Sequence, residues 1–442
     1  MEKESRLHPR SGLTLTMREP AVQICSRCLY TSRHPLHLTF DERGICSGCR
    51  IHEEKDRLDW TARGGKLAAL LERYRSKSQR NYDCIVPVSG ARDSYFIVHM
   101  VKTVLGMNPL LVTYNKQYNT DVGIRNLANL RIKFDRDIMA LTVNPETVKK
   151  ITRATLRRLG SIYWHCLAGQ TVFPVAMAVK LKIPLIVWGA HQGLDQVGMF
   201  SHTDEVEMTR KYRKEHDLMG LEAEDLVDDF DGIAPEDVRS FVYPDDRELE
   251  RVGVRGIYLG NFIRWDTKAQ HEQMIALYDY ETAEQTRTFD TYNDVDCFNY
   301  SDVHDYTKLT KHGYSKATDH AVRELRFGRL TREEAGELAG RYAKEPPRNL
   351  DLFLEWIGMT ASGFDLLMDL HRNNQFWRRG AERRWEYVPG ADEAGEKTRQ
   401  QREEARLPRR GDCRFLLTPS KRPDYLDREY ILVGKGYPAP KA

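Results

Sequence analysis

Short apolar runs alternate with segments of helical periodicity along the first half of the chain. Runs of about five apolar residues are typical of buried strands, and they occupy 84–88, 110–114, 138–142 and 184–188. Apolar residues recur with helical spacing in the segments between them, at 95–105, 121–133, 145–159 and 168–181. This alternation predicts an α/β fold, a parallel doubly wound sheet covered by helices on both faces.

A polar turn follows the first apolar run and precedes the first helical segment. Its residues are Ser89, Gly90, Ala91, Arg92, Asp93 and Ser94. Backbone N–H groups of such a turn, at the amino end of a helix, favour phosphate. Ligands of parallel sheets bind at the carboxyl ends of the strands. The same rule selects the residues that follow two other strands, namely Thr113, Tyr114, Gly189 and His191. We therefore expect a nucleotide site in this crevice.

Several of these residues also fit a purely structural role. Ser, Gly and Asp are ordinary cap and turn residues. Ala91 would be strained by roughly 1 kcal/mol if the turn required positive φ there. Tyr114 either stacks on a base or covers the sheet edge, and His191 either contacts phosphate or substrate or is a surface-loop histidine.

Four of the eight cysteines form two C-x2-C pairs, separated by 17 residues: Cys25, Cys28, Cys46 and Cys49. This spacing is that of a zinc ribbon, with an Fe–S cluster or a labile disulfide pair as alternatives. A closed site of four thiolates leaves zinc no open coordination position, so we expect a structural metal. The other cysteines are scattered, at Cys84, Cys166, Cys297 and Cys413.

The second half of the chain supplies residues that suit a sugar-nucleotide site. Trp265 suits stacking on a sugar face, and the candidates for hydroxyl and diphosphate contacts are Asp266, His304, Asp305 and Lys308. Equally, a tryptophan in an apolar segment is often core, and alternating Asp and Lys on helices are often surface pairs. A capping box at 331–334 opens one predicted helix, and 351–368 is compatible with another.

Length and charge bound the organisation of the chain. The 442 residues exceed one typical domain, and a net charge of +3 gives no electrostatic case for nucleic acid. Without a long apolar window or a signal-peptide core we expect no membrane span and a cytoplasmic location. We expect four units. Residues 20–60 form a zinc ribbon, and residues 61–265 form a nucleotide domain with a solvated or mobile charged insertion at 201–240. Residues 266–376 form a helical substrate or dimer region, and residues 377–442 form a charged, partly disordered tail.

The polar turn resembles the Ser-Gly-Gly-x-Asp-Ser loop of the PP-loop ATP pyrophosphatases, with Ala91 in place of the second Gly and Arg92 where many members carry Lys. Together with the ribbon and with later residues, it resembles the N-acetyl sugar amidotransferases of surface-polysaccharide biosynthesis; these residues are 258–266, 291–293, Cys297, 304–308, Tyr314, Asp319, His320 and 328–335. The resemblance runs in order from Cys25 to Phe364.

That resemblance implies an ATP-dependent conversion of an N-acetyl group to an acetamidino group. Asp93 would hold Mg2+, Arg92 would stabilise the departing pyrophosphate, and His304 or Asp266 would accept a proton from ammonium. The implied partners are an N-acetyl sugar or nucleotide sugar, a separate glutaminase that channels ammonia, and a possible second copy of the chain. Two alternatives stay open: sulfur transfer through Cys166 or Cys297, and a non-catalytic nucleotide-binding scaffold.

Overall fold

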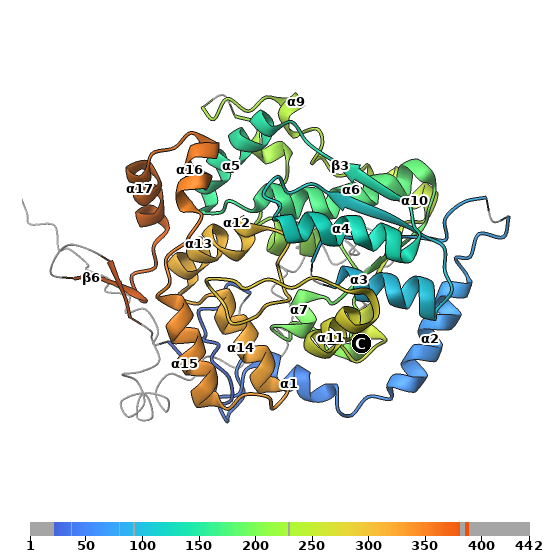
Figure 1. Ribbon diagram of the computed structural model, residues 1–442, viewed down its shortest axis with the longest axis horizontal. Helices are drawn as coiled ribbons and strands as arrows, with labels where there is room; N and C mark the ends of the chain where they lie inside the picture. Colours follow the sequence, from blue (N-terminus) through green and yellow to red (C-terminus); the bar gives the residue numbers. More distant parts are fainter. Residues whose placement is uncertain are drawn as a thin grey trace, which may run out of the picture.

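A five-stranded parallel sheet forms the centre of the computed structural model, which describes residues 22–388 except 37, 79, 92, 229 and 381–384. The strand order is β3-β2-β1-β4-β5 (Figure 1). The strands are β1 Cys84–Pro87, β2 Pro109–Tyr114, β3 Ile138–Leu141, β4 Leu185–Trp188 and β5 Arg255–Tyr258. The predicted parallel α/β class is confirmed, and the four predicted strands are present. The strand order reverses between β1 and β4, where a crevice opens at their carboxyl ends.

Alternate residues of β1 pack on opposite faces of the sheet, as the twofold repeat of a strand requires. Val86 packs in one apolar cluster with Leu130 and Met274, whereas Ile85 packs in another with Val175. The helices that supply these residues are α4 Asp121–Phe134, α11 Thr267–Tyr278 and α6 Trp164–Leu181. Both faces are therefore covered.

The remaining helices surround this unit. In chain order, those before β5 are α1 Ser47–Glu54, α2 Trp60–Glu72, α3 Ser94–Val98, α5 Pro145–Leu159, α7 Gln192–Asp195, α8 Arg210–Tyr212, α9 Pro235–Val238 and α10 Asp246–Val252. Those of the C-terminal part are α12 Phe298–Ser301, α13 Val303–His312, α14 Lys316–Arg326, α15 Arg332–Ala343, α16 Leu350–Ile357 and α17 Ala361–His371. A short antiparallel hairpin follows, β6 Trp377–Arg379 and β7 Trp385–Tyr387. Figure 1 shows the C-terminal helices gathered on one side of the sheet, with the N-terminal segment beside α14.

Two helix predictions for the C-terminal part have different outcomes. The capping box is present, since Thr331 N donates to Glu334 Oε2 over 2.8 Å and Glu334 N donates to Thr331 Oγ1 over 3.2 Å. In contrast, 351–368 holds two helices, because Gly358 ends α16 with a φ of +66°. The predicted tail beyond the hairpin lies outside the described residues.

The charged segment 201–240 is packed into the domain, so the expectation of a solvated insertion is wrong for much of it. Leu218, Leu226 and Val238 belong to an apolar cluster with residues of α5 and α6. Arg213 is fully buried and forms an ion pair of 2.6 Å with Glu222. Apolar residues that pack in the core are interspersed with the acidic residues of this segment. Two of the acidic residues, Asp228 and Asp231, form ion pairs with arginines of α5.

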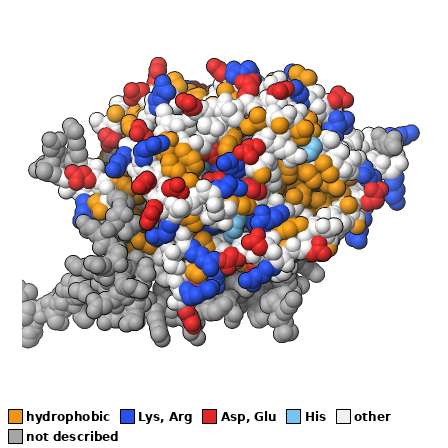
Figure 2. Space-filling view, turned by 60° about the horizontal axis from the view of Figure 1, so that its bottom comes forward, with side chains coloured by type: hydrophobic (Ala, Val, Ile, Leu, Met, Phe, Trp, Pro, Cys, Tyr) orange, Lys and Arg blue, Asp and Glu red, His pale blue; other side chains and the backbone are white. Residues whose placement is uncertain are grey.

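On the face shown in Figure 2, acidic and basic side chains are interspersed, with hydrophobic side chains gathered between them. Among the described residues no single helix is long and apolar enough to cross a membrane. The α5 and α6 pair, bent by 117°, passes the length and composition criteria only when the two helices are taken together.

Candidate functional site

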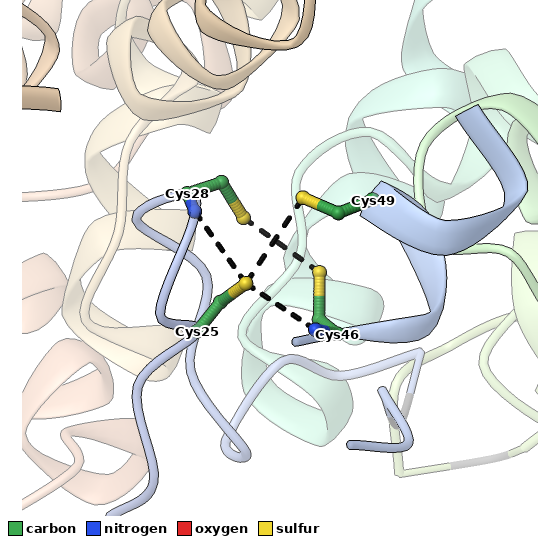
Figure 3. A group of neighbouring side chains, drawn as sticks. All are labelled: Cys25, Cys28, Cys46 and Cys49. Atoms are coloured by element: carbon green, nitrogen blue, oxygen red, sulfur yellow. Dashed lines mark hydrogen bonds between the residues drawn. The ribbon is translucent and has the colours of Figure 1, made fainter. Parts of the chain in front are cut away.

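Four thiol groups converge from the N-terminal segment (Figure 3). Cys25 and Cys28 come from one turn, and Cys46 and Cys49 lie at the start of α1. The Sγ atoms of Cys25 and Cys49 are 4.0 Å apart and those of Cys28 and Cys46 are 3.7 Å apart. A tetrahedral site with Zn–S bonds of about 2.3 Å requires sulfur separations of about 3.8 Å. The four cysteines therefore fit a closed structural zinc site.

Backbone donors hold one of these sulfur atoms in place. Arg27 N and Cys28 N each donate to Cys25 Sγ over 3.4 Å, and Cys46 N donates to it over 3.3 Å. Gly44, with a φ of +71°, makes the turn that leads into the second pair. Such N–H donors stabilise a thiolate, which is the form that binds metal.

The polar turn lies between β1 and α3, as predicted. Gly90 is required there, since a Cβ on it would lie 2.0 Å from the backbone oxygen of Gly123 in α4. Ala91 is fully buried in the apolar core beside β1, and its φ lies outside the left-handed region. Its methyl group therefore produces no backbone strain of the kind expected for positive φ. Ser94 Oγ donates to Ala91 O over 3.0 Å and accepts from Ser89 N over 2.8 Å.

A cavity of about 370 Å³ opens at the carboxyl end of the sheet. On the sheet side, Asp93 and Trp265 line it, and on the opposite side His304 and Lys308 of α13 line it. The structure thus brings together four predicted site residues that are separated by more than 200 positions in the chain. A Cβ on Gly189 would lie 3.2 Å from Trp265 Cη2 and 3.3 Å from Asp93 Oδ2, so Gly189 lies directly behind this wall.

Three predicted nucleotide contacts lie in the core instead. Thr113 and Tyr114 are buried, and the Tyr114 hydroxyl is 3.0 Å from His165 Nδ1. His191 is also buried, and its Nδ1 accepts a hydrogen bond from Leu194 N at the start of α7. Burial lowers the pKa of His191 to about 3, so this ring is neutral near pH 7. All three side chains therefore have structural roles, but His191 is a core residue and not the surface-loop histidine of the alternative interpretation.

Asp266 does not line the cavity. Its two carboxylate oxygens accept hydrogen bonds of 2.9 and 3.1 Å from Arg329, and this guanidinium helps to lower the pKa of Asp266 against the effect of burial. The same side chain caps the amino end of α11. Asp305 does not line the cavity either. It is fully buried, and its Oδ2 lies 2.8 Å from Arg287 Nε. Arg92 lies outside the described residues.

The environment of His304 and Trp265 limits what they do. The ring of His304 packs against Tyr300 and Tyr163, with centroids 5.1 and 5.0 Å away, and burial lowers its pKa to about 3. His304 is therefore a poor proton acceptor at neutral pH. Trp265 is 2% exposed and packs edge to face on Phe96, so little of its ring is available to a sugar.

Lys308 is held by two partners. Its ammonium group forms an ion pair with Asp319 and lies 4.3 Å from the ring centroid of Tyr314. These groups raise the pKa of Lys308, despite burial, so the side chain stays charged.

Sequence reasoning missed much of the cavity wall. Asp217 lines it, and burial raises the pKa of this carboxyl to about 7. Further cations on the wall are Lys311, Lys316, Arg323 and Arg326. The ribbon also contributes, through Tyr30 and His34. The signal that was available is the helical spacing of His304, Thr307, Lys308 and Lys311, whose four side chains all line the cavity.

Residues 286–390 match the family described as LPS biosynthesis protein WbpG-like, C-terminal domain. This region carries α13 and α14, which form the cationic wall of the cavity. A family named for lipopolysaccharide biosynthesis thus covers about a quarter of the chain.

Two further similarities cover 26% and 33% of the chain. An uncharacterized protein of Methanocaldococcus jannaschii is 27% identical over 120 residues, which are 26% of this chain and 42% of that relative. The NH3-dependent NAD synthetase from Campylobacter jejuni, solved in complex with the nitrate ion, shares 13% identity at a TM-score of 0.25. That comparison covers 33% of this chain and 62% of the synthetase chain. The chain therefore spans less than two thirds of the length of either protein.

Proposed function

We propose that this chain is an ATP-dependent amidotransferase that converts the N-acetyl group of a nucleotide-linked sugar to an acetamidino group. The observation that carries the proposal is the cavity itself. One space joins Asp93 of the polar turn to the cationic wall of α13 and α14, within the region that matches a lipopolysaccharide-biosynthesis family.

The reaction needs an activated amide, because an amide carbon is a poor electrophile and oxide is not a viable leaving group. Transfer of AMP to the amide oxygen gives an imidate with a good leaving group, and ammonia then displaces AMP. Asp93 fits a magnesium ligand, since Mg2+ is usually held by one or two carboxylates and phosphate oxygens. Mg2+ would neutralise the charge that develops on pyrophosphate, and from its place in the sequence Arg92 would assist.

Asp217 replaces His304 and Asp266 as the group proposed to take up the proton of the attacking nitrogen. A carboxyl with a pKa of about 7 is well matched to proton exchange near neutral pH. Asp266 is ion-paired away from the cavity, and His304 is too weakly basic. The nitrogen would come as ammonia from a separate glutaminase.

The test is mass spectrometry of N-acetylated UDP-sugars incubated with the zinc-loaded chain, ATP, Mg2+ and ammonium. Replacement of oxygen by NH lowers the sugar mass by about one unit and releases AMP, whereas sulfur from a sulfide donor would raise the mass by about sixteen units. The second outcome would favour sulfur transfer. If no AMP forms with any of the sugars at ATP concentrations that saturate binding, the proposed reaction is wrong and the chain is a non-catalytic nucleotide-binding scaffold.

Cysteine substitution separates the two transfer reactions further. Cys166 and Cys297 are both fully buried, and burial raises the pKa of each thiol, which disfavours a reactive thiolate. The Cys297→Ser variant should therefore retain amidine formation. Loss of activity at unchanged folding stability would instead support a sulfur carrier.

A further inference from the structure

The polar stripe of α13 contains one cation that differs from its neighbours. The stripe consists of His304, Thr307, Lys308 and Lys311, all of which line the cavity. On this wall, Lys308 pairs with Asp319, and Arg323 pairs with Asp290 over 2.7 Å. Lys311 forms no ion pair with a carboxylate among the described residues. Its Nζ donates instead to the carbonyl oxygen of Leu159, over 2.9 Å.

An ammonium group in this position is costly. Burial lowers the pKa of Lys311 to about 8, and no carboxylate of the described residues opposes that effect. Leu159 is the last residue of α5, so its carbonyl lies at the partly negative end of a helix and compensates in part. That contact uses one of the three N–H donors of the ammonium group. The others are available to a ligand.

A second unsatisfied group lies two helical turns away on the same face of α13. Nδ1 of His304 is buried and has no hydrogen-bond partner within the described part of the chain. The ring packs in a cluster with Tyr300 and Tyr163, whose centroids are 4.6 Å from each other, and these contacts restrict its rotation. A neutral imidazole is able to donate one N–H to an oxygen atom.

We propose that Lys311 and His304 form a second anion-binding subsite, which holds an anionic oxygen group of the acceptor substrate. Asp93 and the polar turn serve ATP at the sheet side, and this subsite serves the acceptor at the helical side. The ligand group is a phosphate or a carboxylate, since both supply the missing negative charge and accept several hydrogen bonds. The inference rests on the proposed function only for the identity of the ligand as the acceptor.

Binding measurements test the subsite without reference to turnover. Isothermal titration calorimetry of the full, zinc-loaded chain would use UDP, UDP-N-acetylglucosamine, UDP-glucuronic acid and a non-hydrolysable ATP analogue as probes. Lys311→Met is expected to weaken at least one UDP probe by about tenfold or more, while affinity for the ATP analogue stays unchanged. Lys311→Arg should restore most of the affinity. The control, Lys268→Met, removes a more exposed lysine of α11 that does not line the cavity.

The probes distinguish the two sources of the anion. If Lys311→Met weakens UDP itself, the ligand group is a phosphate. If it weakens only UDP-glucuronic acid, the group is a carboxylate. The inference is overturned if no UDP probe binds the wild-type chain, if affinities are equal in wild type and variant, or if any loss follows a fall in unfolding free energy, which would mean that Lys311 only caps α5. Lys311-dependent binding without AMP formation would contradict the proposed reaction alone.

Discussion

Tyr30, two residues beyond a zinc-binding cysteine, donates a hydrogen bond of 2.7 Å from its hydroxyl to Asp319 Oδ1 in α14. The same carboxylate accepts from Gln196 Nε2 over 2.8 Å and pairs with Lys308. In the same cluster of rings, His34 lies 4.8 Å from Tyr30 and stacks on Tyr314 at 4.9 Å. The ribbon is therefore attached directly to the wall of the cavity.

The first prediction concerns this attachment. Tyr30→Phe removes one donor from a charged acceptor, and we expect a loss of about 1–2 kcal/mol in unfolding free energy. Because Asp319 then holds Lys308 less firmly, KM for the acceptor should rise while KM for ATP stays constant. Urea denaturation and initial rates measure both effects.

Tyr82→Phe is the matched control for this variant. It removes another Tyr–Asp hydrogen bond, to Asp137, at the amino end of the sheet and away from the cavity. This variant should leave both KM values unchanged. An equal rise in both KM values for Tyr30→Phe would contradict a specific link between the ribbon and Lys308.

The second prediction concerns the metal. Elemental analysis should find one zinc per chain, and chelation should lower the thermal midpoint because four buried thiolates, whose sulfur atoms lie within 4.8 Å of one another, repel when no cation neutralises them. Zinc, but not Mg2+, should restore the midpoint. Cys46→Ser should behave as the chelated protein does. An unchanged midpoint after complete zinc removal would show that the four thiols need no metal.

The third prediction compares two aspartates that the sequence alone does not distinguish. Asp93→Asn should reduce AMP formation by at least about a hundredfold, since Asp93 lines the cavity and is the proposed Mg2+ ligand. Asp266→Asn should cost about 1 kcal/mol in unfolding free energy, because it breaks a partly exposed ion pair with Arg329, and should retain most of the turnover. If both variants lose turnover to a comparable extent, Asp266 takes part in catalysis, contrary to this prediction.

The sequence was sufficient where a local pattern determines the structure. Four strands are continuous apolar runs, and the cysteine spacing specifies the ribbon. β5 was missed because Arg255 and Gly256 interrupt its apolar character, although β4 pairs with it along its whole length. A parallel edge strand needs only one hydrogen-bonded neighbour, and no local signal reveals that neighbour.

The orientation of side chains was harder to predict than the position of the loops. His191 does follow β4, yet its ring turns into the core between Tyr212 and Phe200. The cavity wall of α14 and the ribbon depends on contacts between residues almost 300 positions apart, such as Tyr30 and Asp319. Periodicity reports which face of an element is apolar, but it does not report which distant element covers that face.

The fourth prediction concerns Asp217 and pH. Its pKa of about 7 in the folded protein lies above the ordinary aspartate value of 3.8, so the folded state holds the proton more tightly than the unfolded state does. The contribution of Asp217 to stability therefore falls as the pH rises from about 4 to about 7, by at most about 1.4 kcal/mol per pH unit. Asp217→Asn should be more stable than the wild type at pH 8 and about equal to it at pH 4.

Turnover should depend on pH in the opposite direction. The deprotonated carboxylate is the proposed base, so the wild-type rate should rise through a pKa of about 7, and the Asn variant should lose this limb of the profile. Asp195→Asn serves as the control, since Asp195 also lines the cavity but is ion-paired with Lys55, which helps to keep its pKa low. If Asp217→Asn keeps the rising limb while gaining stability at pH 8, Asp217 is a buried carboxyl without a role in proton transfer.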